Sequence, residues 1–406
     1  MLSSRKVLLV VSGGIAAYKA AYVARSLSLL GADVRVVMTR SATEFVGAQT
    51  FAGLTGNPVT TELFTGGPDV PHVELARGAE LVVVAPATAN LIAKMANGIS
   101  DDIASATLLT VRCPILVAPA MHTEMWENAA TQRNIETLRA RGIELVGPTS
   151  GALSSGDEGP GRMSEPDDIV AGAVEVLRRS QELVGVSVLV TAGGTHEPID
   201  PVRFIGNRSS GRMGVTIASE AAARGAKVTL VAGSLSVPVS SGIEVVEGPT
   251  ADEMRAAVIA RAPDADVVIK AAAVADFKPG DPATTKLKKS AGAPEIRLVP
   301  TPDILKELGT DPSLRKTGSV LVGFAAETES DPAGLGTYAE RKRADKGADI
   351  IVANDVSSAD SGFGVDTVRA VIATAAGVRD LGLVSKRDLA RELIDEVIRR
   401  RSTPDV

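Results

Sequence analysis

Short apolar runs alternate with amphipathic helical segments along most of the chain. Runs at 7–11 and 34–38 are long enough for buried strands, and Ala20, Val23 and Leu27 between them recur at helical spacing. This alternation is typical of βαβ units, whose parallel strands are covered by helices on both faces. Further strands are predicted at 81–85, 115–118, 143–146, 186–190, 227–231, 243–246, 267–270, 320–324 and 350–352. The sequence therefore predicts an α/β protein with doubly wound parallel sheets.

Two segments interrupt the alternation. Residues 148–163 are so rich in glycine and proline that we expect a loop or flap without regular structure. Residues 277–294 are predicted to form a surface loop that carries lysines. A helix predicted over 166–183 closes the first half. We therefore place the domain boundary near Val184-Gly185, which gives domains 1–184 and 185–406.

Composition and charge limit the classes of partner and the cellular compartment that we expect. A net charge of −6 argues against nucleic acid as a main partner. The single cysteine, Cys113, allows no disulfide within the chain, which fits a reducing cytoplasm. The apolar run 7–11 ends at Ser12-Gly13-Gly14, too soon for a signal peptide, and no run approaches the length of a membrane span. We expect a cytoplasmic protein without membrane partners.

Two glycine-rich loops follow strands and precede helical patterns. The first is Ser12-Gly13-Gly14, and the second lies within 187–214 and carries Arg203, Arg208 and Arg212. Backbone N–H groups and a helix N-terminus favour phosphate there, and glycine permits close approach. Neither loop has the GxGxxG or GxxxxGK[ST] pattern, so a simple tight turn is the alternative for the first.

Polar side chains gather at the edge of the first predicted sheet where strands end. Thr39 and Ser41 follow strand 34–38, and Thr88 follows strand 81–85, an arrangement suited to a monophosphate and a polar ring system. His72 is predicted just before a helix on this side. A lone histidine is commonly structural, but its titration near neutrality also suits catalysis.

Longer motifs in both halves resemble known enzymes. Segments 12–19, 86–90, 119–126 and 156–163, with the His72 segment, resemble the flavin-dependent cysteine decarboxylases. In the second half, the matching segments resemble phosphopantothenate–cysteine ligases: 204–211, 271–276, 286–289, 323–328 and 353–355. Their order covers almost the whole chain, which is identified as a member of the bifunctional bacterial coenzyme A biosynthesis family. The resemblance implies two Rossmann-like domains, a flavodoxin-like decarboxylase domain followed by a ligase domain.

For the first domain, the resemblance implies FMN as cofactor and His72 as the essential residue. The cysteine thiol of phosphopantothenoylcysteine would be oxidised to a thioaldehyde. This group is an electron sink, so the neighbouring carboxylate can leave as CO2 and an enethiol results. Reduction of the enethiol would give 4'-phosphopantetheine. The substrate residues would include His122 and Met125. The implied FMN residues are Ser12, Gly13, Gly14, Ile15, Thr39, Ser41, Thr88 and Asn90.

Two positions depart from the decarboxylase pattern. His122 stands where the family has a substrate-binding asparagine, and Ser155 stands where the family has a cysteine that protonates the enethiol. Ser155, Asp157 or water would then supply the proton. Cys113 is no replacement, because it lies in a strand-like run outside the flap. We therefore interpret the first domain as a variant decarboxylase. The alternative is a first domain that binds flavin but is not catalytic.

For the second domain, the resemblance implies a ligase that uses CTP and Mg2+ to join cysteine to 4'-phosphopantothenate through an acyl-cytidylate. Asn207 would hold this intermediate and Lys286 would be catalytic, although Lys288 and Lys289 share its loop and any of the three could neutralise the triphosphate. The implied substrate residues are Arg203, the loop Arg208–Gly211 with Ser209, Ser210 and Gly211, Asp276, Lys288, Lys289, Pro302, Asp303, Ile304, Leu305, Phe324, Lys342 and Lys346.

The resemblance also implies a homo-oligomer, in which decarboxylase trimers and ligase dimers build a closed dodecamer. A different class of function, a nicotinamide oxidoreductase with two dinucleotide-binding halves, is the remaining alternative. It is disfavoured because neither half has GxGxxG followed about 20 residues later by a ribose-binding acid.

Overall fold

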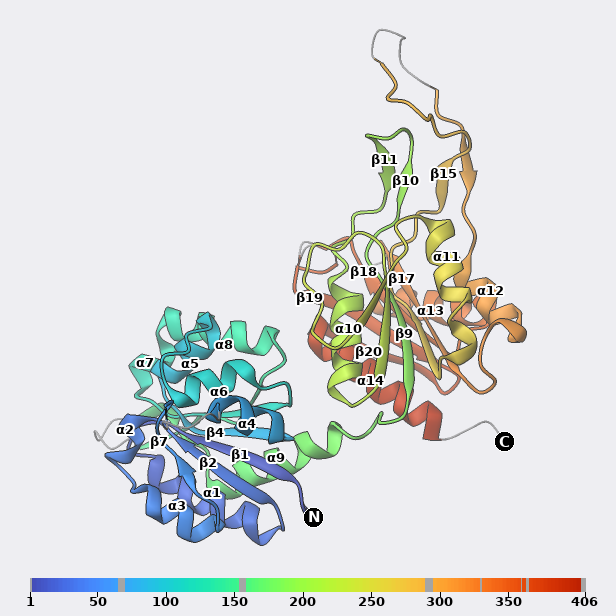
Figure 1. Cartoon of the computed structure of the whole chain (residues 1–406). Coiled ribbons are helices and arrows are strands. Elements are labelled where there is room, and N and C mark those ends of the chain that lie inside the picture. The colour runs from blue at the N-terminus through green and yellow to red at the C-terminus, as the bar shows by residue number, and fades with distance from the viewer. Residues whose placement is uncertain are drawn as a thin grey trace. The chain divides into compact units, whose positions relative to one another are not determined.

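The computed structural model describes residues 2–64, 70–152, 158–288, 295–328, 331–358, 360–362 and 365–402. The chain divides into two compact units, Met1–Gln181 and Glu182–Val406. Each unit contains one large sheet with helices packed on it (Figure 1). Within the described residues, no helix has the length and apolar character needed to cross a membrane.

The first unit is built on a six-stranded parallel sheet in the order β3-β2-β1-β4-β5-β6. Its strands are valine- and leucine-rich and buried on both faces, as parallel strands must be. Helices α1, α3 and α9 pack on one face, and α4, α5, α6 and α8 on the other. The elements are β1 Lys6–Val11, α1 Ala17–Leu29, β2 Asp33–Met38, α2 Arg40–Thr43, α3 Ala48–Thr55, β3 Val59–Thr60, α4 Pro71–Gly78, β4 Leu81–Ala87, α5 Ala89–Asn97, α6 Ile103–Thr110, β5 Ile115–Pro119, α7 Thr123–Glu127, α8 Ala129–Ala140, β6 Glu144–Leu145, β7 Thr149–Ala152, β8 Glu158–Arg162 and α9 Pro166–Arg179.

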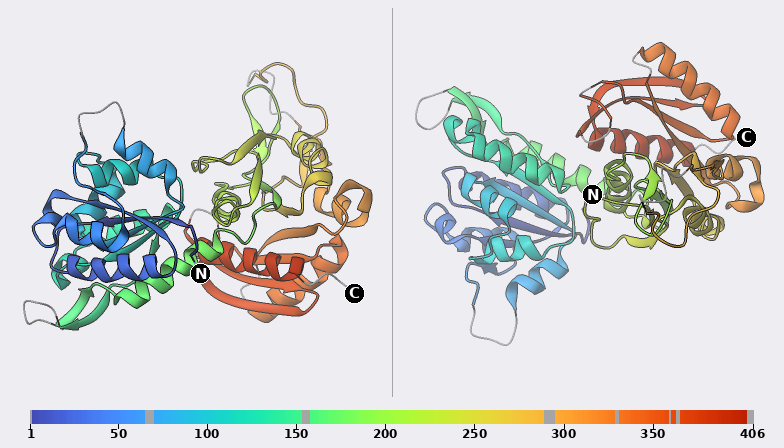
Figure 2. Two further views of the ribbon diagram at one scale, coloured as in Figure 1. Left: turned by 60° about the horizontal axis from the view of Figure 1, so that its bottom comes forward. Right: turned by 90° about the horizontal axis from the view of Figure 1, so that it is seen from above.

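The second unit repeats this order in β13-β12-β9-β14-β17-β18 and then adds two antiparallel strands, β19 and β20, coloured red in Figure 2. Helices α10 and α14 cover one face, and α11, α12 and α13 the other. The elements are β9 Ser187–Ala192, β10 His196–Pro198, β11 Phe204–Gly206, α10 Arg212–Ala223, β12 Lys227–Ala232, β13 Glu244–Glu247, α11 Ala251–Ile259, a 3-10 turn Ala262–Asp264, β14 Val267–Lys270, β15 Phe277–Pro279, β16 Leu298–Pro300, α12 Ile304–Thr310, a 3-10 turn Pro312–Leu314, β17 Val320–Glu327, α13 Pro332–Lys346, β18 Ile350–Asp355, β19 Thr367–Thr374, β20 Gly377–Ser385 and α14 Lys386–Ser402.

The prediction of two doubly wound α/β sheets is confirmed, but several local predictions are wrong. Residues 148–163 contain the antiparallel pair β7–β8, because the glycines let this hairpin pack closely on its neighbour: a Cβ on Gly161 would lie 2.3 Å from the Met121 carbonyl oxygen. The start of 277–294 is strand β15, paired with β16. The helix predicted to 183 ends at Arg179, since Leu183 packs into the core of the second unit. His72 lies in the first turn of α4 rather than before it.

A buried arginine ties together three segments of the second unit. Arg224, which follows α10, is only 2% exposed. Its guanidinium donates to Glu220 at 2.8 Å, to Glu182 at 3.0 Å and to Asp395 of α14. Burial opposes the charge, but Asp395 and Glu220 outweigh it and raise the pKa of Arg224. The attraction in such a buried ion network does little more than offset the desolvation of its charges, but removal of the shared cation takes a close hydrogen-bond donor from all three carboxylates.

We expect Arg224→Leu to lower the free energy of unfolding of the second unit by about 3 kcal/mol, because Glu182 and Glu220 lose the buried guanidinium that donates to both. The measurement is urea denaturation of the full chain followed by circular dichroism. Trp126 is the one tryptophan of the sequence and lies in the first unit, so its fluorescence reports the unfolding of that unit. The urea midpoint measured in this way should be the same as in the wild type. Arg399→Leu is the matched control, since Arg399 forms an exposed pair with Glu396 and its loss should cost under about 1 kcal/mol. Equal midpoints for both variants would contradict the prediction.

Candidate active sites

The first candidate site lies where the strand order of the first sheet reverses, at the carboxyl ends of β1 and β4. Ser12 follows β1, and its hydroxyl donates to the Pro86 carbonyl at 2.7 Å and accepts from the Thr88 N–H at 3.0 Å. The hydroxyls of Ser12 and Thr88 are 3.2 Å apart. Ligands of open parallel sheets bind in the crevice at such a reversal. The structure thus brings together two loops separated by more than 70 residues.

Glycine is required where the first of these loops meets the loop after β2. A Cβ built on Gly13 would lie 2.3 Å from Ser41 Cβ and 2.6 Å from its carbonyl carbon, so a side chain there would force the loops apart. Gly14 meets only Thr88 Cγ2, at 3.6 Å. Thr39 caps α2 by accepting from the Ala42 N–H. The predicted loops therefore form one cradle with backbone close to any ligand.

Other residues predicted for the first site surround this cradle or lie apart from it. Ile15 is 64% exposed beside Gly14, and Asn90 is exposed in the first turn of α5. His72 is half-buried, and its Nδ1 is buried with no hydrogen-bond partner among the described residues. A buried polar atom of this kind calls for a ligand or a bound water. Ser155 lies outside the described residues.

His122 lies next to the β7–β8 hairpin. It precedes α7, and its Nδ1 pairs with the carboxylate of Glu124. The backbone N–H of Met121 donates to the Gly161 carbonyl at 3.0 Å, which joins this segment to β8. Hydrogen bonds from its own backbone N–H and from His122 hold the pKa of Glu124 below its usual value. Met125, in α7, is half exposed. At the position where the decarboxylases that the sequence resembles have an asparagine, this chain therefore has an imidazole paired with a carboxylate.

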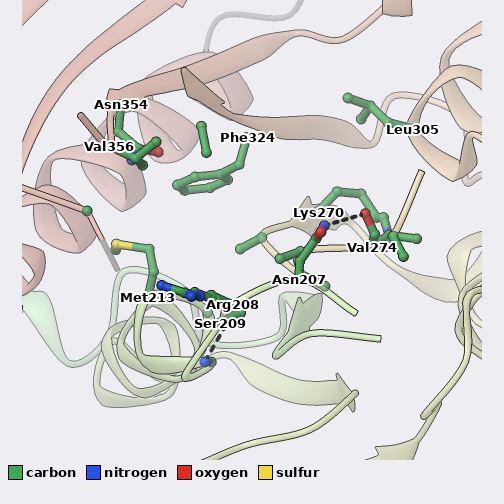
Figure 3. Close-up of a pocket in the computed structure, with 18 of the residues that line it drawn as sticks. Asn207, Arg208, Ser209, Met213, Lys270, Val274, Leu305, Phe324, Asn354 and Val356 are labelled. Carbon is green, nitrogen blue, oxygen red and sulfur yellow. Dashed lines mark hydrogen bonds between the residues drawn. The ribbon is translucent and has the colours of Figure 1, made fainter. Parts of the chain in front are cut away.

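The second candidate site is a cavity of about 610 Å³ at the corresponding edge of the second sheet. Its walls come from the loop before α10, the end of β14, the segment before α12 and helix α13. Figure 3 labels Asn207 and Arg208 of the loop and Lys270 of β14. It includes most of the residues predicted for this half: Asn207, Ser209, Ser210, Gly211, Asp276, Pro302, Asp303, Ile304, Leu305, Phe324, Lys342 and Lys346. Segments that are distant in sequence are therefore brought to one place by the fold.

Asn207 is held at the reversal point between β9 and β14. Its side-chain amide donates to the Val274 carbonyl at 3.0 Å, and a Cβ on Gly194 would lie 2.9 Å from the Asn207 backbone oxygen. Gly211, which precedes α10, has φ +73° and touches Gly193, so any side chain there would be strained and crowded. The glycine-rich loop is thereby packed against the sheet edge.

The opposite wall carries positive charge. Lys346 of α13 pairs with Asp303, and although burial opposes ionisation of Asp303, Lys346 and the Lys306 N–H hold its pKa below the usual value. Burial lowers the pKa of Lys342, whose ammonium lies 5.6 Å from the centre of the Tyr338 ring. This wall therefore favours an anionic ligand.

Three predicted residues of the second half do not line the cavity. Arg203 forms an ion pair with Asp200 and donates to the Leu287 carbonyl at 2.8 Å, and Arg203 holds the pKa of Asp200 well below its usual range. Lys286 and Lys288 flank Leu287 and are exposed. These residues belong to the arm made by β10–β11 and β15–β16, which projects beyond the sheet (Figure 1). Lys289 lies outside the described residues.

Sequence reasoning assigned no role to three polar residues of the cavity, although one of them, Asn354, lies in the segment 353–355 that carries the resemblance. Lys270 is the last residue of β14, Asn354 lies in β18, and Lys386 begins α14. Lys386 donates to the carbonyls of Gly362 and Val365 at 2.8 and 2.6 Å. The only signal for Lys270 was its place at the end of an otherwise apolar strand.

Metal-binding side chains are not clustered in the described part of the chain, where no three His, Cys, Asp or Glu residues could hold an ion together. A magnesium ion that arrives with a nucleotide needs no such cluster, because substrate phosphates and one or two carboxylates are its usual ligands. Asp276 is a carboxylate at the cavity that could take this part.

Two sheets of the same strand order, each with a glycine-lined cradle at its reversal point, define a two-domain α/β enzyme with two separate small-molecule sites. The family described as "Flavoprotein" matches residues 1–178, and the family described as "DNA/pantothenate metabolism flavoprotein C-terminal domain" matches residues 183–400.

Curated relatives extend the match to the whole chain. The "Coenzyme A biosynthesis bifunctional protein CoaBC" of Mycolicibacterium smegmatis is 46% identical over 410 residues, covering 98% of both chains, and that of Escherichia coli K12 is 41% identical over 404 residues, again covering 98% of both. The chain therefore belongs to the family of bifunctional coenzyme A biosynthesis proteins. A solved C-terminal domain of a protein of that name is 37% identical, with a TM-score of 0.45 over 54% of this chain and 97% of that one.

Cys113 is expected to be an inert thiol. It is half-buried before β5, and burial raises its pKa to about 11. At pH 8 only about a thousandth of it is thiolate, the reactive form. Alkylation by iodoacetamide at pH 8, followed by mass spectrometry, should be about a hundredfold slower than in the urea-unfolded chain and should accelerate as the pH approaches 11. Rapid alkylation of the folded protein at pH 8 would show the assignment to be wrong.

Proposed function

We propose that the second unit joins cysteine to 4'-phosphopantothenate with CTP and that the first unit decarboxylates the product to 4'-phosphopantetheine. Membership of the bifunctional coenzyme A family supports the pair of activities, and the presence of two separate cradles supports one activity in each unit. The product of the ligation is the substrate of the decarboxylation. The single observation that carries the proposal is the shared strand order, which gives each unit its own ligand edge.

The cradle of the first unit fits FMN. The close approach of Gly13 to Ser41 leaves backbone, rather than side chain, at the surface where a phosphate would lie, and the hydroxyls of Ser12 and Thr88 border it. Thr39 and Asn90 would complete the polar edge, while exposed Ile15 offers an apolar surface for a ring. When bound, FMN supplies the two-electron oxidation of the thiol that makes loss of the carboxylate possible.

The residues around this cradle suggest how the substrate is handled. Nδ1 of His72 has no hydrogen-bond partner among the described residues, so it would be able to orient the thiol and exchange its proton. His122, paired with Glu124, would donate a hydrogen bond to the substrate carboxylate, and Met125 would pack on the pantetheine arm. Ser155, Asp157 or water remains the proposed proton donor for the enethiol. The raised pKa of Cys113 argues against that thiol in this role.

In the second unit the cavity supports a two-step ligation. The carboxylate of phosphopantothenate would attack the α-phosphate of CTP and release pyrophosphate; the cysteine amine would then form the amide and release CMP. The amide of Asn207 and the loop Ser209–Gly211 would hold the acyl phosphate, and Lys342 and Lys346 would face the charge that develops there. Pro302, Ile304, Leu305 and Phe324 offer apolar surface to the base, and Mg2+ would enter with the triphosphate.

Residues of the arm are proposed to act once substrates are bound. Arg203 anchors the backbone of Leu287, so it positions Lys286 and Lys288 rather than contacting the cavity as the chain stands. A dodecamer of decarboxylase trimers and ligase dimers remains our proposal for the assembly. The alternative function, a ligase with a flavin-binding but non-catalytic first unit, is favoured by one observation: Glu124 occupies one nitrogen of His122, where the family has a neutral asparagine.

The two sites should be separable by mutation. We expect Asn207→Ala to reduce amide formation about 100-fold or more, because the acyl phosphate loses a hydrogen-bond donor, and to leave CO2 release from phosphopantothenoylcysteine intact. His72→Ala should do the reverse. Pyrophosphate, amide and CO2 are followed separately with CTP and with ATP. Wild-type protein that makes amide but no CO2 would support the non-catalytic alternative instead.

The FMN cradle can be tested by adding a single methyl group. We expect Gly13→Ala to weaken FMN binding by about tenfold or more, since overpacking of this kind costs about 1–3 kcal/mol. Gly14→Ala is the matched control, because its Cβ makes only ordinary contact with Thr88. Fluorescence quenching during FMN titration gives both affinities. If the two variants bind FMN equally well, the phosphate does not lie at this loop.

A further inference from the structure

Lys270 is a buried amine that lines the second cavity and has no hydrogen-bond partner in the described part of the chain. It ends β14, in register with Thr191 of β9 and Gly323 of β17, so it lies at the strand-order reversal. Only 7% of the residue is exposed, and its Nζ has no hydrogen-bond partner anywhere in the described ranges. It lines the cavity on the same side as Asn207 and Val274 (Figure 3).

Two other lysines that line the cavity already have partners. Lys346 pairs with Asp303, and Lys386 donates to two backbone carbonyls. Burying an ammonium without such contacts is costly. If position 270 only had to fill space in the core, an apolar residue would make the folded state more stable. Asp303 acts on Lys270 through its charge but forms no hydrogen bond with it, so a ligand that enters the cavity could supply the direct anionic partner.

We infer that Lys270 is a catalytic residue of the ligation, whose ammonium binds the reacting phosphate shared by the nucleotide and the acyl-nucleotide. The inference rests on the proposed function of this cavity. Its support is positional: Lys270 and Asn207 flank the edge of the sheet where a phosphate is expected, and the glycine loop leaves backbone room there. In the first step the carboxylate oxygen bonds to phosphorus and the bond to pyrophosphate breaks. Lys270 stabilises the non-bridging oxygens and transfers no proton.

Proton uptake is an independent signature of this contact. Burial lowers the pKa of Lys270 to about 7, and the charge of Asp303 only partly opposes this. At pH 8 the amine is therefore mostly neutral before a ligand binds, and a phosphate raises its pKa and draws in a proton. The other charged groups at the cavity are Arg208, Arg212, Asp276, Asp303, Lys342, Lys346 and Lys386.

The test uses Lys270→Met in the full chain, with Lys227→Met as control, since Lys227 is exposed at the opposite end of its strand from the cavity. We expect Lys270→Met to slow pyrophosphate release about 100-fold and to melt at or above the wild-type temperature, because an unpaired buried amine has been removed. CO2 release from phosphopantothenoylcysteine should be unchanged. Lys227→Met should match wild type in all three.

Calorimetry of CTP binding at pH 8, in buffers of different ionisation enthalpy, should show uptake of nearly one proton by wild type and none by Lys270→Met. Titration with 4'-phosphopantothenate alone should show no such difference. The inference is overturned if pyrophosphate release by the variant stays within about twofold of wild type, if wild-type CTP binding takes up no proton, or if the proton accompanies phosphopantothenate instead. Wild-type protein that releases no pyrophosphate at all would instead refute the proposed ligase function.

Discussion

The reversal of strand order is the constraint on which both sites depend. In each sheet the chain winds outward in one direction from the first strand and then returns to start again on its other side, giving β3-β2-β1-β4-β5-β6 and β13-β12-β9-β14-β17-β18. Neighbouring connections diverge at this point, and the carboxyl ends of two adjacent strands stay uncovered. Loops that leave these ends can approach a ligand only if their backbones come close, which explains Gly13 against Ser41 and Gly194 against Asn207.

The central strands could be predicted from sequence because burial on both faces demands uninterrupted apolar runs. Strands β4 and β14 are examples, because the apolar runs that predicted them, Val82–Val84 and Val267–Ile269, are fully buried in the structure. Hairpins lack that signal. Strands β19 and β20 extend the parallel sheet in the antiparallel direction, and neither was among the predicted strands. In β7–β8 glycine content suggested an irregular loop, whereas the glycines serve close packing on the segment before α7.

The candidate sites were predictable where their residues are local in sequence. Asn207 and Gly211 belong to one loop, and Ser12 to Gly14 to another, so a motif can carry them. Lys270 could not be found in that way, because nothing near it in sequence says that its amine lacks a partner; that depends on where Asp303 and α13 lie. Arg203 shows the converse. A motif can identify it, but only the fold shows that Asp200 and the Leu287 carbonyl occupy its guanidinium.

At each candidate site one buried polar atom has no hydrogen-bond partner among the described residues: Nδ1 of His72 in the first unit and Nζ of Lys270 in the second. Such groups lower native stability, because a buried donor or acceptor loses water and gains nothing in return. They are tolerated where a ligand completes them, and binding then adds to the stability of the folded state in proportion to ligand concentration. The ion network of Arg224 differs in kind: it is satisfied within the chain and holds the scaffold without any ligand. The Arg224 network thus stabilises the fold whether or not a ligand is bound, whereas His72 and Lys270 gain a partner only when a ligand arrives.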